Sequence, residues 1–194
     1  MPALILASKS SIRRKMLQEA GLDFQVVPAD IDEEAEKVGK DSLEAIAQGL
    51  AEAKARAVSL KRPGDWVIGS DSVIAVDGAL FSKPRDRQEA ADHLRSFSGK
   101  KMLLVSAVAL ARDGQVEWST FGPAELDVRE LSDAFIESYL DVEWPEVANT
   151  VGVFRMEGPG IQLFEKVTGG HFTILGMPLI PVLRQLRKRG LLKS

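Results

Sequence analysis

The chain has 194 residues, of which 45% are hydrophobic and 27% are charged, and its net charge at pH 7 is −3. This composition is typical of a globular domain and excludes an extended disordered chain. The sequence has no cysteine and two histidines, which excludes disulfides, thiolate zinc sites, His-rich metal sites and a cysteine nucleophile. Any bound metal must therefore have oxygen ligands, which favours magnesium or manganese over zinc.

Charge and hydropathy also restrict the partners and the location. Strongly basic sequence is confined to the end of the chain, which gives little support to a surface that binds duplex DNA or RNA. No apolar run approaches the roughly 18 residues of a membrane-spanning helix, and the first residues lack the pattern of a secretory signal. We therefore expect a cytoplasmic protein that does not bind membranes.

The amino-terminal segment is predicted to form a strand, a serine-rich turn and a helix. Residues 3–7 are a short continuous apolar run, which indicates a buried strand. Ser10 or Ser11 is a suitable helix N-cap, and Gly21 is a suitable residue to end the helix. The turn contains neither a P-loop motif nor the GxGxxG fingerprint of dinucleotide-binding folds.

The same turn has the features of a phosphate site. Ser8 and Ser10 place hydroxyl groups beside the free backbone N–H groups of the helix start, which attract anions. Arg13 and Arg14 lie in the first helical turn, where the helix dipole disfavours cations, and a bound anion would explain both. The alternative is that the serines only cap the helix and that both arginines face water.

An acidic run follows a second predicted strand at residues 24–27. Five acids fall among residues 30–36, and Glu33 is the most central of those that we consider for a site. In most proteins such an acidic run is a solvated loop. A solvated loop is therefore the alternative to a functional role for Glu33.

A long helix is predicted at residues 41–60, opened by a capping box of Asp41 and Glu44. Its apolar residues form one stripe, and Lys54 falls on that stripe. A lysine on a buried helix face is uncommon unless its ammonium group reaches water or has an anionic partner. Lys54 is therefore a third candidate cation for one site.

Residues 66–76 have the composition of a buried strand, yet Asp71 lies in the middle of it. A buried carboxylate is unfavourable unless a cation, a metal or hydrogen-bond donors meet it. Asp77 and Gly78 predict a hairpin that carries Lys83 toward the same end of the sheet. An acid and a lysine would then converge, with a purely structural ion pair as the alternative.

The rest of the chain mixes helices, hairpins and short strands. A capping box of Asp86 and Glu89 opens a helix in which His93 is expected to be partly buried rather than a ligand. Helices and strands are mixed along the chain without strict βαβ alternation, which predicts a single α/β domain, residues 1–194, with a mixed sheet. The later predicted elements are strands at 102–111, 116–128, 151–155, 161–167 and 171–175, and helices at 132–140 and from Pro178 onward.

Several cations and a few carboxylates, without histidine or cysteine, are suited to magnesium-assisted chemistry on a polyphosphate. The cations neutralise phosphate charge, the carboxylates hold the metal, and one carboxylate activates water. The candidates that share this description are Ser8, Ser10, Arg13, Arg14, Glu33, Lys54, Asp71 and Lys83.

Short motifs occur in an order that extends over essentially the whole chain. They are LILASKSSIRRKML, AEAKARA around Lys54, GSDSVIAVDG around Asp71, SKP at Lys83, FSG at 97–99 and LGMPLIPVL near the end. This ordered set resembles the Maf family of nucleoside triphosphate pyrophosphatases, whose amino-terminal signature is LASxSxxR with a second arginine adjoining. Each motif is weak alone, and the set is specific.

The resemblance implies hydrolysis of a nucleotide between its α and β phosphates, giving a monophosphate and pyrophosphate with a divalent metal, magnesium or manganese. It implies an elongated, twisted mixed sheet flanked by helices, in two lobes with the nucleotide in a cleft between them, commonly as a homodimer. The roles carried over are proton acceptor for Asp71, metal binding for Glu33 and Asp71, and phosphate contacts for Lys54, Lys83, Ser8, Arg13 and Arg14.

The sequence departs from the commonest family pattern in three places. Ser11-Ile12 precedes the arginines where many members have one proline, FRMEGPG at 154–160 replaces YxIQG, and Lys100-Lys101-Met102 stands where a histidine often follows SG. The first two departures resemble the 7-methyl-GTP subgroup rather than the dTTP and UTP subgroup. Glu157 is therefore a candidate for recognition of the base, with an exposed turn acid as the alternative.

Two other functions remain to be distinguished from this hydrolase. One is a nucleotide-binding regulatory protein of cell division or septum formation, in which hydrolysis is vestigial. The water-activating Asp71 and the lysines Lys54 and Lys83 argue against it, because binding alone needs no general base. The other is a generic phosphatase, which would release orthophosphate first.

Overall fold

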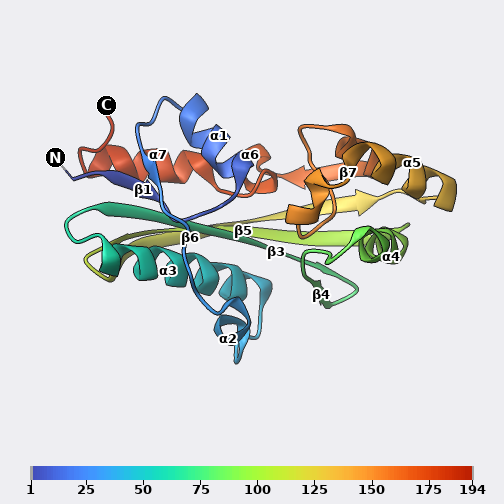
Figure 1. Cartoon of the computed structure of the whole chain (residues 1–194), viewed down its shortest axis with the longest axis horizontal. Coiled ribbons are helices and arrows are strands. Elements are labelled where there is room, and N and C mark those ends of the chain that lie inside the picture. Colours follow the sequence, from blue (N-terminus) through green and yellow to red (C-terminus); the bar gives the residue numbers. More distant parts are fainter. Residues whose placement is uncertain (1, 194) are drawn as a thin grey trace. The chain divides into compact units, whose positions relative to one another are not determined.

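The computed structural model describes residues 2–193 and has a mixed α/β architecture. Seven strands form one sheet in the order β2-β1-β3-β5-β6-β7, and β4 pairs with β3 (Figure 1). The α/β class with a mixed sheet flanked by helices is thereby confirmed. The strands are β1 Leu4–Leu6, β2 Gln25–Val26, β3 Trp66–Val76, β4 Ala79–Phe81, β5 Lys101–Arg112, β6 Gln115–Val128 and β7 Phe164–Gly169.

Helices flank the sheet, and none within residues 2–193 is long and apolar enough to cross a bilayer. The α-helices are α1 Ser11–Glu19, α2 Glu33–Lys37, α3 Leu43–Lys61, α4 Arg87–Phe97, α5 Asp133–Glu143, α6 His171–Ile174 and α7 Leu179–Lys188. Two short 3-10 helices, η1 Glu146–Asn149 and η2 Pro159–Leu163, lie between α5 and β7.

The chain divides into two compact units. Unit 1 comprises Met1–Ser72, Val105–Gly122 and Gly170–Ser194, and unit 2 comprises Val73–Leu104 and Pro123–Gly169. Strands β3, β5 and β6 each contribute residues to both units. The predicted nucleotide cleft between two lobes stays a prediction.

The core of unit 1 follows from the alternation of side chains along β1. Leu4 and Leu6 join an apolar cluster with Met16 and Leu17 of α1 and with Leu186 of α7. Figure 1 shows α1 and α7 on one face of the sheet and α3 on the other. Successive strand residues point to opposite faces, so a short central strand buried on both sides has an unbroken apolar sequence.

The opposite face of β1 packs toward α3. Ile5 and Ala7 form a second cluster with Val67 of β3 and Val58 of α3. The β1 strand pairs in parallel with β2 and with β3, so it lies between them. This arrangement fixes the serine-rich turn that follows β1 beside the middle of β3.

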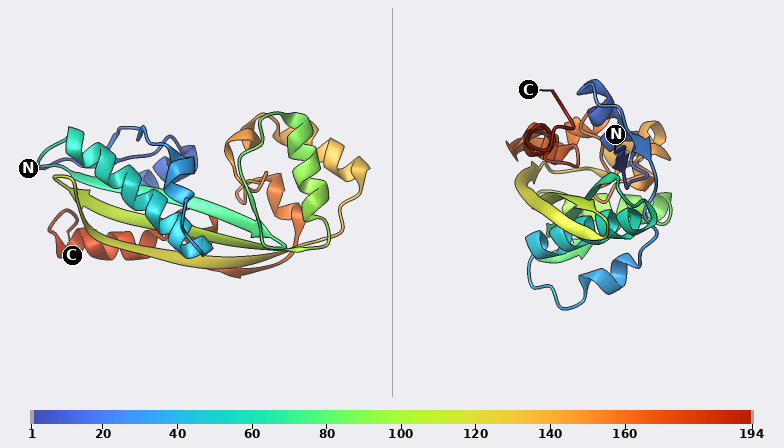
Figure 2. Two further views of the ribbon diagram at one scale, coloured as in Figure 1. Left: turned by 90° about the horizontal axis from the view of Figure 1, so that it is seen from below. Right: turned by 90° about the vertical axis from the view of Figure 1, so that its left-hand side faces the viewer.

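Unit 2 is built around α4 and α5, which pack against each other; Figure 2 shows them from two further directions. Phe81 of β4 makes edge contacts with His93 and with Phe97 of α4. His93 is partly buried, as predicted, and burial lowers its pKa, while the nearby carboxylates of Glu89 and Asp92 oppose that change. The ring of His93 therefore packs against the aromatic side chains beside it.

Two Asp-Gly hairpin turns are present, and the first of them was predicted. Asp77-Gly78 connects β3 to β4, and Asp113-Gly114 connects β5 to β6, with positive φ at all four residues. A two-residue hairpin loop of this type needs positive φ at both positions, which aspartate tolerates and glycine adopts without strain.

Several local predictions were wrong. The cap of α3 is Ser42, whose side chain accepts from the Ala45 N–H, rather than Asp41. Residues 171–175 were predicted as a strand and contain the short helix α6, because a brief apolar run does not distinguish the two states. Residues 151–155 form turns, and β7 begins at Phe164 instead of residue 161. The acidic run is not merely a loop, since it contains α2.

Candidate active site

Asp71 lies in the middle of β3, and two cations from different helices meet its carboxylate. Its side chain is 13% exposed, Lys54 Nζ of α3 lies 3.3 Å from Oδ1, and Arg13 NH2 of α1 lies 3.9 Å from the same oxygen. The predicted convergence of the buried acid, the helical lysine and the serine–arginine turn is therefore present within unit 1. These are the distances of ion pairs in a nearly closed environment, where charge interactions are stronger than in water.

A glycine in β3 allows α3 to come this close. A Cβ atom at Gly69 would lie 2.2 Å from the Ala51 carbonyl oxygen and 2.5 Å from the Ala55 nitrogen. The backbone of α3 thus packs directly on β3. The contact on β3 is two residues before Asp71, and the contacts on α3 lie within one turn of Lys54. We did not single out Gly69 in the sequence, although a glycine inside a strand is a signal of close backbone approach.

Lys54 also pairs with Glu33 at the start of α2. The two charged groups are 2.7 Å apart, and the side chains are 12% and 47% exposed, respectively. Asp32 caps α2 by accepting from the N–H groups of Glu34 and Ala35, and this holds the first turn in place. Lys54 therefore bridges two carboxylates, one from the acidic run and one from the buried strand.

In the serine–arginine turn one arginine is buried, so the alternative in which both arginines face water is wrong, and the phosphate site stays a prediction. Ser10 caps α1 by accepting from the Arg13 N–H, and Ser8 Oγ accepts from the Ser10 N–H and from Arg13 NH1. Arg13 is buried and points toward Asp71, whereas Arg14 is exposed. Burial lowers the pKa of the Arg13 guanidinium, and the carboxylates of Asp71 and Glu33 act in the opposite direction.

The donor set is compatible with a divalent metal that binds together with phosphate. Among residues 2–193, no three acidic or histidine side chains gather into a metal site. Glu33 and Asp71, however, present carboxylate oxygens on either side of Lys54. Magnesium is commonly held by one or two carboxylates together with substrate phosphates, so this pair suits such an ion.

Lys83 and Glu157 belong to unit 2. Lys83 is exposed just after β4, in the hairpin that was predicted. Glu157 is exposed in the turn before η2. Hydrogen bonding to Glu143 is the main cause that raises the pKa of Arg155, and the charges of Glu143 and Glu157 add to it. That these two side chains act on the same ligand as Asp71 stays a prediction.

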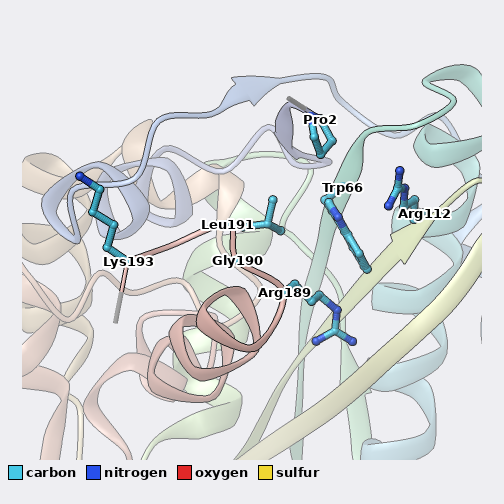
Figure 3. A pocket seen from close by; sticks show the side chains of 7 residues that line it. All are labelled: Pro2, Trp66, Arg112, Arg189, Gly190, Leu191 and Lys193. Atoms are coloured by element: carbon cyan, nitrogen blue, oxygen red, sulfur yellow. The ribbon is translucent and has the colours of Figure 1, made fainter.

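A pocket of about 590 Å³ lies at the start of β3, away from Asp71. Figure 3 shows Trp66 with Arg112 and Arg189 near its indole, at 5.6 Å and 5.0 Å from guanidinium carbon to ring centroid. The described residues that line this pocket include no carboxylate that could activate water. Its residues are Pro2, Trp66, Arg112, Arg189, Gly190, Leu191 and Lys193.

The sequence that carries this site is similar to those of known proteins. A family model described as Maf-like protein matches residues 3–189. The chain belongs to the Maf family. The buried acid, the bridging lysine and the buried arginine all lie in the motifs that suggested this family, and the structure brings those motifs together within unit 1.

Two relatives of similar length are named as pyrophosphatases. The chain is 47% identical over 191 residues to a nucleoside triphosphate pyrophosphatase of Nitrobacter hamburgensis, covering 97% of this chain and 95% of the relative. It is 45% identical over 194 residues to a 7-methyl-GTP pyrophosphatase of Rhizobium etli, covering 97% of each chain. A solved HAM1 protein structure from Coxiella burnetii aligns with 66% of this chain and 73% of that chain, at TM-score 0.45 and 18% identity. The last likeness is too distant to indicate an activity.

Proposed function

We propose that this protein is a nucleoside triphosphate pyrophosphatase, a hydrolase that cleaves the bond between the α and β phosphates. The observation that carries the proposal is the carboxylate of Asp71, nearly buried between Lys54 and Arg13. A base within a cationic pocket is suited to activating water beside a polyphosphate. Relatives at 43–47% identity are named as pyrophosphatases, which supports the same reaction.

The proposed step uses Asp71 as the proton acceptor. A water molecule attacks the α phosphorus and transfers a proton to Asp71, while the bond from that phosphorus to the bridging oxygen breaks. Pyrophosphate leaves with the electron pair of that bond, and the nucleoside monophosphate retains the new oxygen. Lys54 and Arg13 stabilise the negative charge that spreads over the phosphoryl oxygens, because cations fixed in a poorly hydrated site need no reorganisation.

We propose that Glu33 and Asp71 hold the divalent cation, magnesium or manganese. When bound, this ion would neutralise phosphate charge and orient the chain of phosphates. The two carboxylates supply the hard oxygen ligands that either ion prefers. In this proposal the Lys54 ammonium group contacts the phosphates as well as the carboxylates of Glu33 and Asp71.

The remaining predicted contacts involve the ends of the substrate. Ser8, Ser10 and Arg14 would contact phosphate at the start of α1, where backbone N–H groups and the helix dipole favour anions. Lys83 would contact phosphate, and Glu157 would recognise the base. The name of the Rhizobium etli relative and the sequence around Glu157 support 7-methyl-GTP as a preferred substrate.

A substrate panel tests the reaction and the base together. Canonical nucleoside triphosphates and 7-methyl-GTP are incubated with the protein and magnesium or manganese, and pyrophosphate and orthophosphate are measured separately. We expect pyrophosphate as the first product and the highest kcat/KM for 7-methyl-GTP. Orthophosphate as the first product would instead identify a phosphatase, and tight binding without turnover across the panel would identify a regulatory nucleotide-binding protein.

We further propose that the protein acts in the cytoplasm as a homodimer, as the family resemblance implies. Sedimentation equilibrium over a range of protein concentrations measures the mass in solution. A mass of one chain at all concentrations would contradict the dimer.

A further inference from the structure

The carbonyl oxygen of Gly176 lies at a point where three side chains of unit 1 meet. Arg13 Nε donates to it at 2.8 Å, Ser70 Oγ lies at 3.1 Å, and Ser72 Oγ lies at 3.3 Å. Gly176 lies in the loop between α6 and α7, and its contact with Arg13 joins residues 163 positions apart. Arg13 Nε makes the shortest of these contacts, and Ser70 Oγ also lies 2.8 Å from the Ala107 carbonyl, so the guanidinium is the main donor to Gly176.

A second series of hydrogen bonds starts from another nitrogen of the same guanidinium. Arg13 NH2 donates to Ser72 Oγ at 2.9 Å, Ser72 Oγ lies 2.7 Å from Ser106 Oγ, and Ser106 Oγ donates to the Thr173 carbonyl at 2.7 Å. Ser106 is fully buried. None of the mechanistic roles proposed above uses Ser106 or Gly176.

Counting hydrogens gives this series a direction. A serine hydroxyl has one hydrogen, and that of Ser106 is directed at the Thr173 carbonyl. The hydrogen between the two hydroxyls must then belong to Ser72, which leaves the lone pairs of Ser72 available for the Arg13 N–H. Hydrogen bonds that run in one direction polarise and strengthen one another.

The backbone at Gly176 makes this loop difficult to alter. Its φ is +115°, a conformation that residues with a side chain rarely adopt. A Cβ atom there would lie 3.5 Å from Arg13 Nε and 3.5 Å from Ser72 Oγ. A glycine at position 176 can therefore adopt the backbone conformation in which its carbonyl oxygen faces the Arg13 guanidinium.

We propose that Ser106 and Gly176 are positioning residues that fix the guanidinium of Arg13 before substrate binds. Helix α6 and the loop that follows it supply both acceptors, the Gly176 carbonyl of the loop directly and the Thr173 carbonyl of α6 through Ser106 and Ser72. One edge of the guanidinium is held by these groups, and NH2 remains 3.9 Å from Asp71. The kinetic consequence of this arrangement rests on the proposed function, whereas the anchoring of Arg13 does not.

The kinetic test compares two buried serines. Ser106→Ala removes the middle of the series, and Ser59→Ala makes the same change at a serine that bonds Arg56 and Gly114 instead. We expect kcat for pyrophosphate release to fall about tenfold in Ser106→Ala with KM little changed, because a displaced group stabilises the transition state poorly. Ser59→Ala should retain the wild-type kcat.

A conservative variant separates positioning from stability. Ser106→Thr keeps the hydroxyl and adds a methyl group in a fully buried position, so it should lower the melting temperature more than Ser106→Ala does. Its kcat should nevertheless recover toward the wild-type value. Equal kcat in wild type and a folded Ser106→Ala would overturn the kinetic role, as would loss of kcat that simply follows the melting temperature across the three serine variants.

An NMR measurement tests the anchoring without any turnover. The Nε–H signals of Arg13 and its neighbour Arg14 are identified by their loss in Arg13→Lys and Arg14→Lys. We expect the buried Arg13 signal to exchange with solvent far more slowly than that of exposed Arg14, and to exchange faster in Ser106→Ala. Fast exchange of Arg13 in the wild type would overturn the inference even if the serine variants did not fold. An inactive wild type with a slowly exchanging Arg13 would instead contradict the proposed function alone.

Discussion

Two buried acids in this protein are treated in opposite ways. Glu143 of unit 2 has a side chain that is 2% exposed, and it receives two hydrogen bonds from Arg155, at 2.8 and 2.9 Å. Asp71 of unit 1 is 13% exposed and is met by Lys54 at 3.3 Å and by Arg13 at 3.9 Å. Of these two acids, Glu143 has a bidentate partner and Asp71 does not.

The difference is the one expected between a structural acid and the general base that we propose for Asp71. A bidentate arginine holds a carboxylate in a fixed geometry, which suits a structural role. Asp71 is surrounded by cations that are themselves shared, since Lys54 also pairs with Glu33 and Arg13 also bonds Gly176. Looser contacts leave the oxygens of Asp71 available for water, which is what a general base requires.

The largest effect is expected from converting each acid to its amide. Asp71→Asn removes the proton acceptor with almost no change of shape and should lower kcat about 10³-fold. Glu143→Gln should reduce stability while leaving kcat of the folded protein near that of the wild type. Steady-state pyrophosphate release and circular dichroism measure the two quantities. A folded Asp71→Asn protein with wild-type turnover would refute the assignment of Asp71.

Removing the arginine from the structural pair should be the most costly change for stability. Arg155→Met leaves the carboxylate of Glu143 buried without its partner and should lower the free energy of unfolding by about 3 kcal/mol. The double variant Glu143→Met/Arg155→Met should be more stable than the single one, because no unpaired charge remains. Urea unfolding measures both values, and a single variant as stable as the wild type would contradict the structural role.

Removing the shared lysine should weaken the reactive site more than the fold. Lys54→Met leaves Glu33 and Asp71 without the cation between them and should lower kcat about 100-fold, through loss of charge stabilisation in the transition state. Lys15→Met is the matched control, because Lys15 forms only an exposed pair with Glu19 on α1. Similar kinetics of the two lysine variants would show that the bridge has no role in the reaction.

A smaller effect should appear at high pH in unit 2. Burial raises the pKa of Tyr139, the nearby charge of Glu143 adds to this, and the hydroxyl donates to the Val153 carbonyl. The unfolded phenol titrates near pH 10, so the stabilisation is complete below about pH 10 and is lost above it, by about 1.4 kcal/mol per pH unit. Tyr139→Phe should lack this part of the pH dependence.

The chain has a single tyrosine, so its titration is observed directly by absorbance near 295 nm. Tyrosinate should form well above pH 10 in the folded protein and near pH 10 after unfolding. Tyrosinate at about pH 10 with native circular dichroism would show that Tyr139 is not held as described.

Much of the local structure could be predicted because it depends on neighbouring residues. The Asp77-Gly78 turn, the Ser10 cap of α1 and the buried strand around Asp71 each follow from a few adjacent side chains. The errors fell where a short segment had no local signal that distinguishes two states. Residues 171–175 are apolar enough for a strand, and the short helix α6 that they contain is contacted from a distant segment, since Ser106 of β5 donates to the Thr173 carbonyl.

The site could be predicted only in part. Lys54 and Asp71 stood out because each is a charged residue in an apolar pattern, and both are in the site. Gly69, Ser106 and Gly176 did not stand out, because a small residue has a role only when a second segment approaches it. Their importance is a property of packing.

The sequence by itself determined the order of the elements, the hairpins, and the presence of an acid that a buried strand could not leave uncompensated. Only the tertiary structure decided that Arg13 and Lys54 compensate Asp71 incompletely while Arg155 compensates Glu143 in full. The physical reason is the distance along the chain between the interacting groups. Caps and turns are satisfied by groups a few residues away, whereas the partners of a buried charge are brought by segments distant in the chain, and their distances decide whether that charge is structural or reactive.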